Sequence, residues 1–150
     1  MRINITGKHK TVDTAMIRKA MQFYARELMP KLHTKIRVDL DIQTGLVKSE
    51  GIDGGVSWVG RPTRPGHFVM DIEAKMGMSR TLRILAHEMV HVAQFAQGKM
   101  VDVNDQRGVK FHGKYHVVHD DDRYWTQPWE IEAYGREPGL YHRFKRDNKL

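Results

Sequence analysis

The sequence of 150 residues contains no cysteine, which excludes disulfide bonds and thiolate metal ligands. It has no apolar run that approaches the roughly 20 residues needed to cross a bilayer. The opening stretch, MRINITGKHK, lacks the apolar segment of a secretory signal peptide. We therefore expect a protein that has no membrane partner and works in the cytoplasm.

Negative charge is scarce at both ends of the chain. The net charge is +7, and residues 1–37 alone carry a local charge of +7. Residues 140–150 add +3, whereas the stretch between these ends carries −3. Basic segments of this kind can contact phosphate groups. The basic ends therefore indicate either a weak nucleic-acid contact or an ordinary solvated basic surface.

The hydrophobic pattern predicts strands grouped between helices, which is typical of an α+β fold in one domain spanning residues 1–150. Alternating residues predict strands, and the clearest has Ile36, Val38, Leu40 and Ile42 on one face. Ser79 is the predicted N-cap of a long helix that ends before Gly98. The predicted strands are 2–6, 35–42, 56–60 and 67–76, with weaker character at 109–119; the predicted helices are 13–29, 79–97 and a short one at 128–137, and 49–55 is a predicted turn.

The segment RILAHEMVHVAQFAQG carries the motif H-E-x-x-H, formed by His87, Glu88 and His91. Residues four apart lie one turn above each other on a helix, so both imidazoles can bind one Zn²⁺. Glu88 lies on the neighbouring surface and can take a proton from a water whose pKa the zinc lowers. The helix around the motif is strongly apolar, and buried polar side chains without a partner would be costly there. The pattern therefore predicts a zinc site with a built-in base.

A catalytic zinc site needs a third protein ligand, and the sequence offers several. Gln94 and Gln97 occupy the positions where a metzincin would have glycine and histidine, which excludes that class. The candidates lie downstream and are Glu130, Glu132, His112, His116 and His119. Glu130 is preferred, because Ala133 lies on the same helix face and its small side chain lets two helices approach. Glu132 points about 200° away from Glu130 on a helix and is expected to face solvent or a basic neighbour.

HEMVHVAQ followed by PWEIEAYGRE resembles the small zincin-like metallopeptidases of the gluzincin type, often encoded by phages or bacteria. The resemblance implies a small mixed sheet, a metal helix and a later helix that bears a glutamate. It also implies that His87, His91 and Glu130 bind Zn²⁺ and that Glu88 is the base. In many gluzincins an acidic residue four positions after the glutamate ligand orients a histidine, but here that position is Tyr134. A more distant resemblance is to the SprT-like proteases, which use a third histidine.

These observations predict a zinc-dependent metallopeptidase that acts on a peptide or protein in the cytoplasm, or in the host cytoplasm if a phage encodes it. The alternative is a nucleic-acid-binding or phage accessory protein in which zinc is structural. The strand at 67–74 is expected to border the cleft and pair with an extended substrate. The residue that stabilises an oxyanion is left open among Tyr115, Tyr124, Tyr134, His112 and His116.

Overall fold

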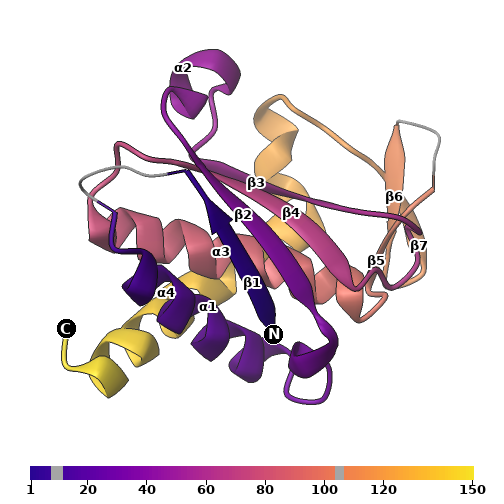
Figure 1. Cartoon of the computed structure of the whole chain (residues 1–150). Helices are drawn as coiled ribbons and strands as arrows, with labels where there is room; N and C mark the ends of the chain where they lie inside the picture. The colour runs from indigo at the N-terminus through magenta and orange to yellow at the C-terminus, as the bar shows by residue number, and fades with distance from the viewer. Residues whose placement is uncertain (8–11, 104–106) are drawn as a thin grey trace.

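The computed structural model describes residues 1–7, 12–103 and 107–150, and these form the mixed α+β arrangement that the sequence predicts (Figure 1). Its elements are β1 (Arg2–Thr6), α1 (Thr14–Leu28), β2 (Arg37–Gln43), α2 (Leu46–Glu50), β3 (Gly54–Trp58), β4 (His67–Glu73), α3 (Met78–Ala96), β5 (Met100–Asp102), β6 (Gly108–Phe111), β7 (Lys114–Val117) and α4 (Pro128–Asn148), with 3₁₀ turns η1 (His33–Lys35) and η2 (Asp122–Thr126).

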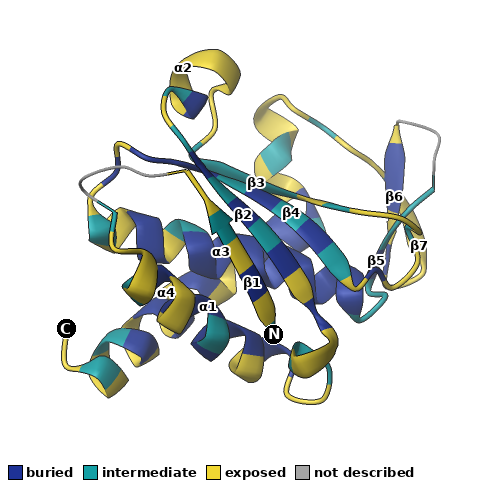
Figure 2. Ribbon diagram, in the orientation of Figure 1, coloured by how far each residue is buried: buried dark blue, intermediate teal, exposed yellow. Residues whose placement is uncertain are grey.

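The main sheet has the strand order β1-β2-β4-β3, in which β3 alone is antiparallel to its neighbour. Alternate residues of β2 are buried, as the sequence pattern predicts, and Val38 lies between Ile3 of β1 and Phe68 of β4. The buried face of the sheet packs toward the helices, whereas the other face of β2 and β4 is mainly polar and partly exposed (Figure 2). The expectation of a small mixed sheet is therefore confirmed.

Helix α1 forms where the sequence predicts it. The side chain of Asp13 caps the helix by accepting a hydrogen bond from the backbone N–H of Met16, at 3.0 Å. The helix stops just before Pro30, which cannot continue it. Its buried stripe includes Ile17 and Tyr24, and the Tyr24 hydroxyl donates to the Leu82 carbonyl of α3 at 3.1 Å. Helix α1 is thereby fixed against the long central helix.

Helix α3 packs against strands β3 and β4 of the main sheet and against the helices α1 and α4. It is buried on almost every side from Leu85 to Ala96, because it is covered on several faces at once. The predicted N-cap at Ser79 is wrong. Gly77 has the extended backbone of an N-cap, and its carbonyl accepts the hydrogen bond from the N–H of Thr81, so the helix begins at Met78.

Two helices depart from the sequence expectation. Helix α4 is not short but has 21 residues, and it continues through Pro138. Leu140 and Phe144 beyond the proline are buried in the core, so tertiary packing holds the second half of the helix. Helix α2 occupies part of the predicted turn region and is bounded by Gly45 and Gly51, both with positive φ.

Strands β5, β6 and β7 form a separate antiparallel sheet beside the main one (Figure 1). The turn between β6 and β7 consists of His112 and Gly113, which both have positive φ. A two-residue turn with positive φ at both positions matches the right-handed twist of a hairpin. His112 is therefore a turn residue in this sheet.

Candidate metal centre

The two histidines of the motif face the same point from α3. The Nε2 atoms of His87 and His91 lie 3.1 Å apart, and both side chains are buried. This is the arrangement that the four-residue spacing predicts for one helix face. Two buried imidazole nitrogens this close together can bind the same metal ion.

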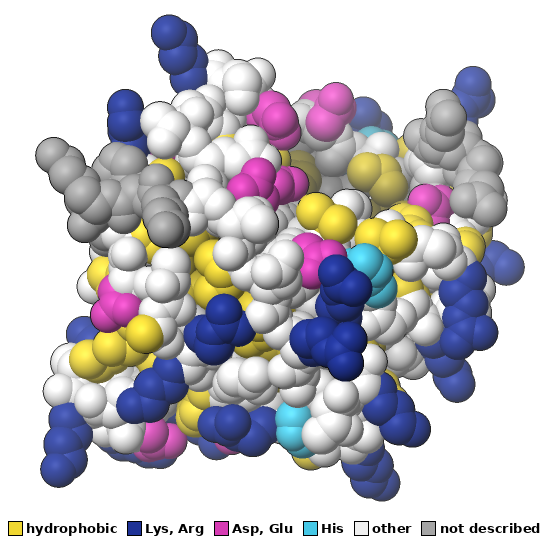
Figure 3. All heavy atoms as spheres, viewed as in Figure 1, with side chains coloured by type: hydrophobic (Ala, Val, Ile, Leu, Met, Phe, Trp, Pro, Cys, Tyr) yellow, Lys and Arg dark blue, Asp and Glu magenta, His cyan; other side chains and the backbone are white. Residues whose placement is uncertain are grey.

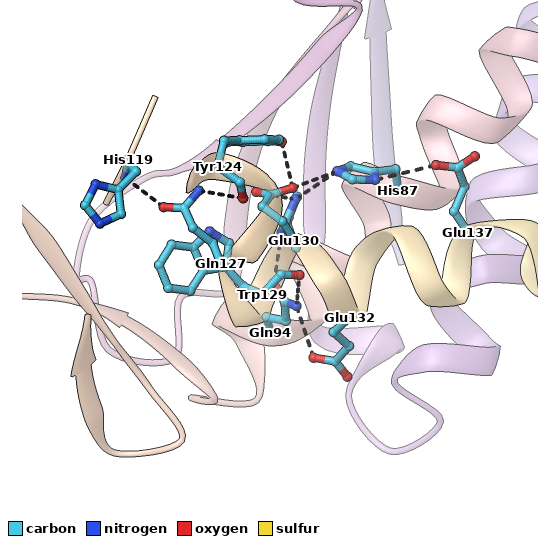
Figure 4. Close-up of polar contacts among 10 residues, drawn as sticks. His87, Gln94, His119, Tyr124, Gln127, Trp129, Glu130, Glu132 and Glu137 are labelled. Atoms are coloured by element: carbon cyan, nitrogen blue, oxygen red, sulfur yellow. Dashed lines mark hydrogen bonds and ion pairs between the residues drawn. The ribbon is translucent and has the colours of Figure 1, made fainter. Parts of the chain in front are cut away.

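Glu130 comes to the same point from the first turn of α4. One of its carboxylate oxygens lies 3.4 Å from Nε2 of His87, and the other lies 3.4 Å from Nε2 of His91 (Figure 4). Helix α4 can approach α3 this closely because Ala133, one turn on, is fully buried and small. The structure therefore brings together the three side chains that the sequence analysis assigns to zinc.

The three donor atoms fit a zinc ion. Tetrahedral Zn²⁺ with ligands at about 2.0–2.1 Å holds its ligand atoms about 3.3–3.4 Å apart. The two Nε2 atoms lie 3.1 Å apart, and each lies 3.4 Å from a different oxygen of the Glu130 carboxylate, so each of these separations is close to that value. In the described part of the chain, these three residues form the group of potential metal ligands whose donor atoms all lie within 4.8 Å of one another. Two nitrogens and one carboxylate oxygen are a donor set that zinc accepts.

Gln94 fixes the ring of His91. Its amide NH₂ donates to the backbone carbonyl of Trp129 and to Glu132, each at 3.0 Å, so its oxygen must point the other way. That oxygen lies 2.8 Å from Nδ1 of His91 and accepts its N–H. Because this bond keeps a proton on Nδ1, Nε2 is the ring nitrogen that faces Glu130, and it would bind a metal after giving up its own proton.

Glu137 stands behind the other histidine. Its Oε2 is 3.6 Å from Nδ1 of His87, and its Oε1 accepts a hydrogen bond from Arg83 at 2.8 Å. Within the described residues, Nδ1 of His87 is buried without a hydrogen-bond partner, and Glu137 is the acidic group that faces it. Glu137 is not among the residues predicted from the sequence, because the gluzincin pattern has its acid at position 134. A signal was present, since Glu137 follows Glu130 by seven residues, or two helical turns.

Two tyrosines lie against the cluster. The hydroxyl of Tyr124 donates to Oε2 of Glu130 at 2.7 Å, and it reaches the site from η2 (Figure 4). The ring of Tyr134 packs edge-on against the ring of His87, with centroids 4.4 Å apart. Tyr134 thus occupies space beside the histidine at the position where the gluzincin pattern has an acid.

Burial and charge together set the pKa values in the cluster. Burial raises the pKa of Glu88, and the nearby charges of His91 and His87 oppose this only in part. Burial alone would lower the pKa of His87, but the carboxylates of Glu130, Glu137 and Glu88 outweigh it and raise the pKa to about 9. The hydrogen bonds from His87 and His91 hold the pKa of Glu130 well below its usual range, against the effect of burial.

The raised pKa of His87 predicts that the zinc-free protein loses stability as the pH rises. The folded state binds a proton on His87 more tightly than the unfolded chain does, so this contribution is full below pH 6.5 and is lost on passing about pH 9. Urea unfolding of zinc-free protein between pH 6 and pH 9.5 measures it. His87→Gln should flatten this decline, and an equal decline in that variant would contradict the assignment.

A cavity of about 250 Å³ opens over the cluster. The side chains of Glu88 and Glu130 line it, and so do Gly54 and Val56 of strand β3. Gly54 is needed here, because a Cβ would lie 2.7 Å from Ile84 and would push the strand away from α3. The strand that borders the cleft is therefore β3.

The expectation that the strand at 67–74 pairs with substrate is wrong. That strand is β4, and both of its edges are already hydrogen-bonded, to β2 and to β3. A strand with two neighbours has no free backbone groups for a third. Alternation along a sequence predicts a strand but not its place in the sheet, and here the edge next to the cleft belongs to β3.

The other candidate ligands lie elsewhere. Glu132 accepts from Gln94 and forms ion pairs with Arg136 at 3.0 Å and Lys99 at 3.7 Å, which matches the expected basic neighbour. His112 is in the β6–β7 turn, and His116 packs its ring on Trp129. The backbone N–H of His119 donates to Gln127 at 2.8 Å. The described cluster does not include any of these three histidines.

The two basic ends of the chain lie side by side, since Arg143 of α4 forms an ion pair with Glu27 of α1 at 2.6 Å. Arg146 pairs with Asp147 at 2.8 Å, so part of the terminal charge is already neutralised. Lys8 and Lys10 lie outside the described residues. Lys and Arg side chains are spread over the lower part and the margins of the face in Figure 3. A nucleic-acid contact through these ends stays a prediction.

Comparisons with protein-family models, with curated proteins and with solved structures find no match for this chain. None of the helices in the described ranges combines the length and apolar character needed to cross a membrane.

Proposed function

We propose that this protein is a zinc-dependent hydrolase and, more narrowly, a zincin-like peptidase. The observation that carries the proposal is the convergence of His87, His91 and Glu130 on one point, with Glu88 beside it in the wall of the same cavity. The order of elements also supports it, because an edge strand, the metal helix and a glutamate-bearing helix surround that cavity. The protein's substrate would be a peptide or another protein.

The donor set favours a catalytic zinc over a structural one. Structural zinc is usually held by four protein ligands, whereas catalytic zinc keeps a position open for water or substrate. Three side chains make up the described cluster, and a cavity lies directly over them. When bound there, zinc would polarise a carbonyl and lower the pKa of water. The structural-zinc alternative would need a fourth ligand from the protein.

Glu88 is the proposed general base and then the general acid. It is buried beside the two histidines, and burial raises the pKa of its carboxyl, which makes the carboxylate a stronger base. It would take a proton from the water that attacks the peptide carbonyl and deliver it to the leaving amine. Its place in the cavity wall puts it within reach of both events.

Tyr124 is the best placed oxyanion donor among the candidates that the sequence leaves open. It lines the cavity, and its hydroxyl already lies at Glu130, one of the proposed ligands. Burial and the neighbouring Glu130 raise the pKa of Tyr124, so the phenol keeps its proton and can donate. Tyr115 is half-exposed on β7, outside the residues that line this cavity.

Tyr124→Phe should lower kcat roughly 10²-fold and change KM little, because the donor acts on charge that develops in the transition state. Steady-state kinetics on zinc-loaded protein measure the split. Tyr115→Phe, which removes a hydroxyl from a residue outside the lining of this cavity, is the matched control. An unchanged kcat in Tyr124→Phe with full zinc content would remove Tyr124 from the mechanism.

Strand β3 offers a way to bind an extended peptide. Its partner in the described sheet is β4 on one side, and Gly54, Gly55 and Val56 line the cavity over the cluster. A peptide that paired with this edge would have its backbone carbonyls held beside Glu88. Backbone pairing selects extended chains rather than particular side chains, which suits a peptidase.

The proposal is tested by zinc-dependent cleavage of a peptide mixture. Purified protein is stripped with a chelator, reloaded with one equivalent of zinc and incubated with peptides of varied sequence, and mass spectrometry identifies the products. We expect cleavage with zinc and none after chelation, with recovery when zinc is restored. Zinc binding without cleavage across the mixture would favour the structural-zinc alternative.

A further inference from the structure

A second cavity, of about 390 Å³, opens beside the metal centre. It shares four lining residues with the cavity over the cluster, namely Gly54, His87, Glu88 and Tyr124. The two spaces are therefore neighbours that meet at the proposed base. A substrate side chain bound in the second cavity would therefore belong to a residue whose backbone lies next to Glu88.

The outer wall of this second cavity is apolar and aromatic. The rings of Trp125 of η2 and Tyr134 of α4 pack at a tilt, with centroids 5.1 Å apart, and Ile84 of α3 and Ile52 before β3 also line the cavity. Trp125 is 62% exposed and Ile52 is 41% exposed. Large apolar side chains that remain exposed around one hollow mark a binding place for apolar groups.

The charged groups in this wall are already paired. Asp53 forms an ion pair with Arg80. Glu137 accepts from Arg83 and faces His87. Glu88 belongs to the part shared with the metal centre. Among the described residues, the wall thus offers a charged substrate side chain no unpaired partner, and burial of such a side chain without one would be costly.

We propose that Ile52, Ile84, Trp125 and Tyr134 form an aromatic subsite that receives the substrate side chain next to the scissile bond. Its occupant is a large aromatic side chain, such as that of phenylalanine. Two aromatic rings in contact and two branched aliphatic side chains provide the faces and edges against which a ring packs well. This inference rests on the proposed peptidase function and specifies its substrate class.

The test uses a series of quenched fluorogenic peptides that differ at one position, which is Phe, Leu, Ala, Asp or Lys in an otherwise constant sequence. We expect cleavage at the bond next to that position, with kcat/KM about 10- to 100-fold higher for Phe than for Ala. Leu should fall between them, and Asp and Lys should be the poorest. Equal rates for Phe and Ala would overturn the aromatic subsite.

Trp125→Ala isolates the subsite from the chemistry. Its side chain is largely exposed and lies outside the cavity over the cluster, so we expect the fold and the zinc content to be retained. The Phe-to-Ala ratio should fall to about threefold or less, because kcat/KM should fall much more for the Phe peptide than for the Ala peptide. Tyr115→Ala removes an aromatic ring from β7 and is the control that should keep the full ratio.

A binding measurement separates failure of the subsite from failure of the peptidase proposal. Zinc-loaded Glu88→Gln is titrated calorimetrically with the Phe and Ala peptides, with and without Trp125→Ala. Preference for Phe that requires Trp125, in a wild type that cleaves nothing, supports the subsite and overturns the peptidase. Cleavage that shows no preference, or a preference unaffected by Trp125→Ala, overturns the subsite alone. Absence of both binding and cleavage overturns both.

Discussion

Glu88→Gln is expected to keep one zinc ion per chain and to lose peptide hydrolysis by about 10²- to 10⁴-fold, the usual contribution of a general base. The amide has nearly the shape of the carboxylate but cannot take a proton. Glu88 is buried beside His87 and His91. Among the described residues, it is the carboxylate that lines both cavities. Zinc analysis and initial rates on the same sample measure both parts of this prediction.

Glu50→Gln, which makes the same chemical change at an exposed position on α2, is the matched control and should be fully active. Two results would contradict the role given to Glu88. Full activity of Glu88→Gln would mean that another group takes the proton. Loss of zinc from Glu88→Gln would make this residue a ligand rather than a base.

Glu130→Ala should weaken zinc binding more than about 100-fold, which exceeds the loss usually caused by outer partners of a metal ligand. Its two carboxylate oxygens lie 3.4 Å from Nε2 of His87 and of His91, so the variant removes one of three converging donors. His87→Ala and His91→Ala should release zinc for the same reason. Competition with a chromogenic chelator gives the zinc Kd of each variant.

Glu132→Ala is the matched control for Glu130→Ala, because it truncates a glutamate two residues away on the same helix. Glu132 reaches the cluster only through Gln94, which in turn orients His91. We expect its zinc Kd to rise less than about tenfold. A larger loss in Glu132→Ala than in Glu130→Ala would exchange their roles. Release of zinc by His112→Ala, His116→Ala or His119→Ala would instead favour a three-histidine site and the SprT-like comparison.

The parts of the fold that depend on neighbouring residues could be predicted from the sequence. Asp13 and Pro30 bound α1 through local hydrogen bonding and ring geometry, and alternation along β2 separates its two faces. The length of α4 could not be predicted, because Pro138 argues against continuation and only the burial of Phe144 by distant elements outweighs it. The edge position of β3 likewise depends on pairing between strands, which no local pattern encodes.

The candidate site also has one part that could be predicted from the sequence and another that could not. The four-residue spacing of His87 and His91 determines their common face, so their convergence could be predicted. The positions of Gln94 and Glu137 behind the two histidines depend on how α3 and α4 cross. In the sequence alone, Gln94 serves only to exclude the metzincins, and nothing in the expected motif points to Glu137. Both are tertiary partners, and their contribution emerges only when the helices are packed.

The most direct test of the central claim is anomalous diffraction at the zinc absorption edge from crystals of the zinc-loaded protein. We predict one anomalous peak per chain, within about 2.0–2.2 Å of Nε2 of His87, Nε2 of His91 and a carboxylate oxygen of Glu130, with no fourth protein ligand. A peak elsewhere, no peak, or a fourth protein side chain that closes the site would contradict a catalytic zinc centre.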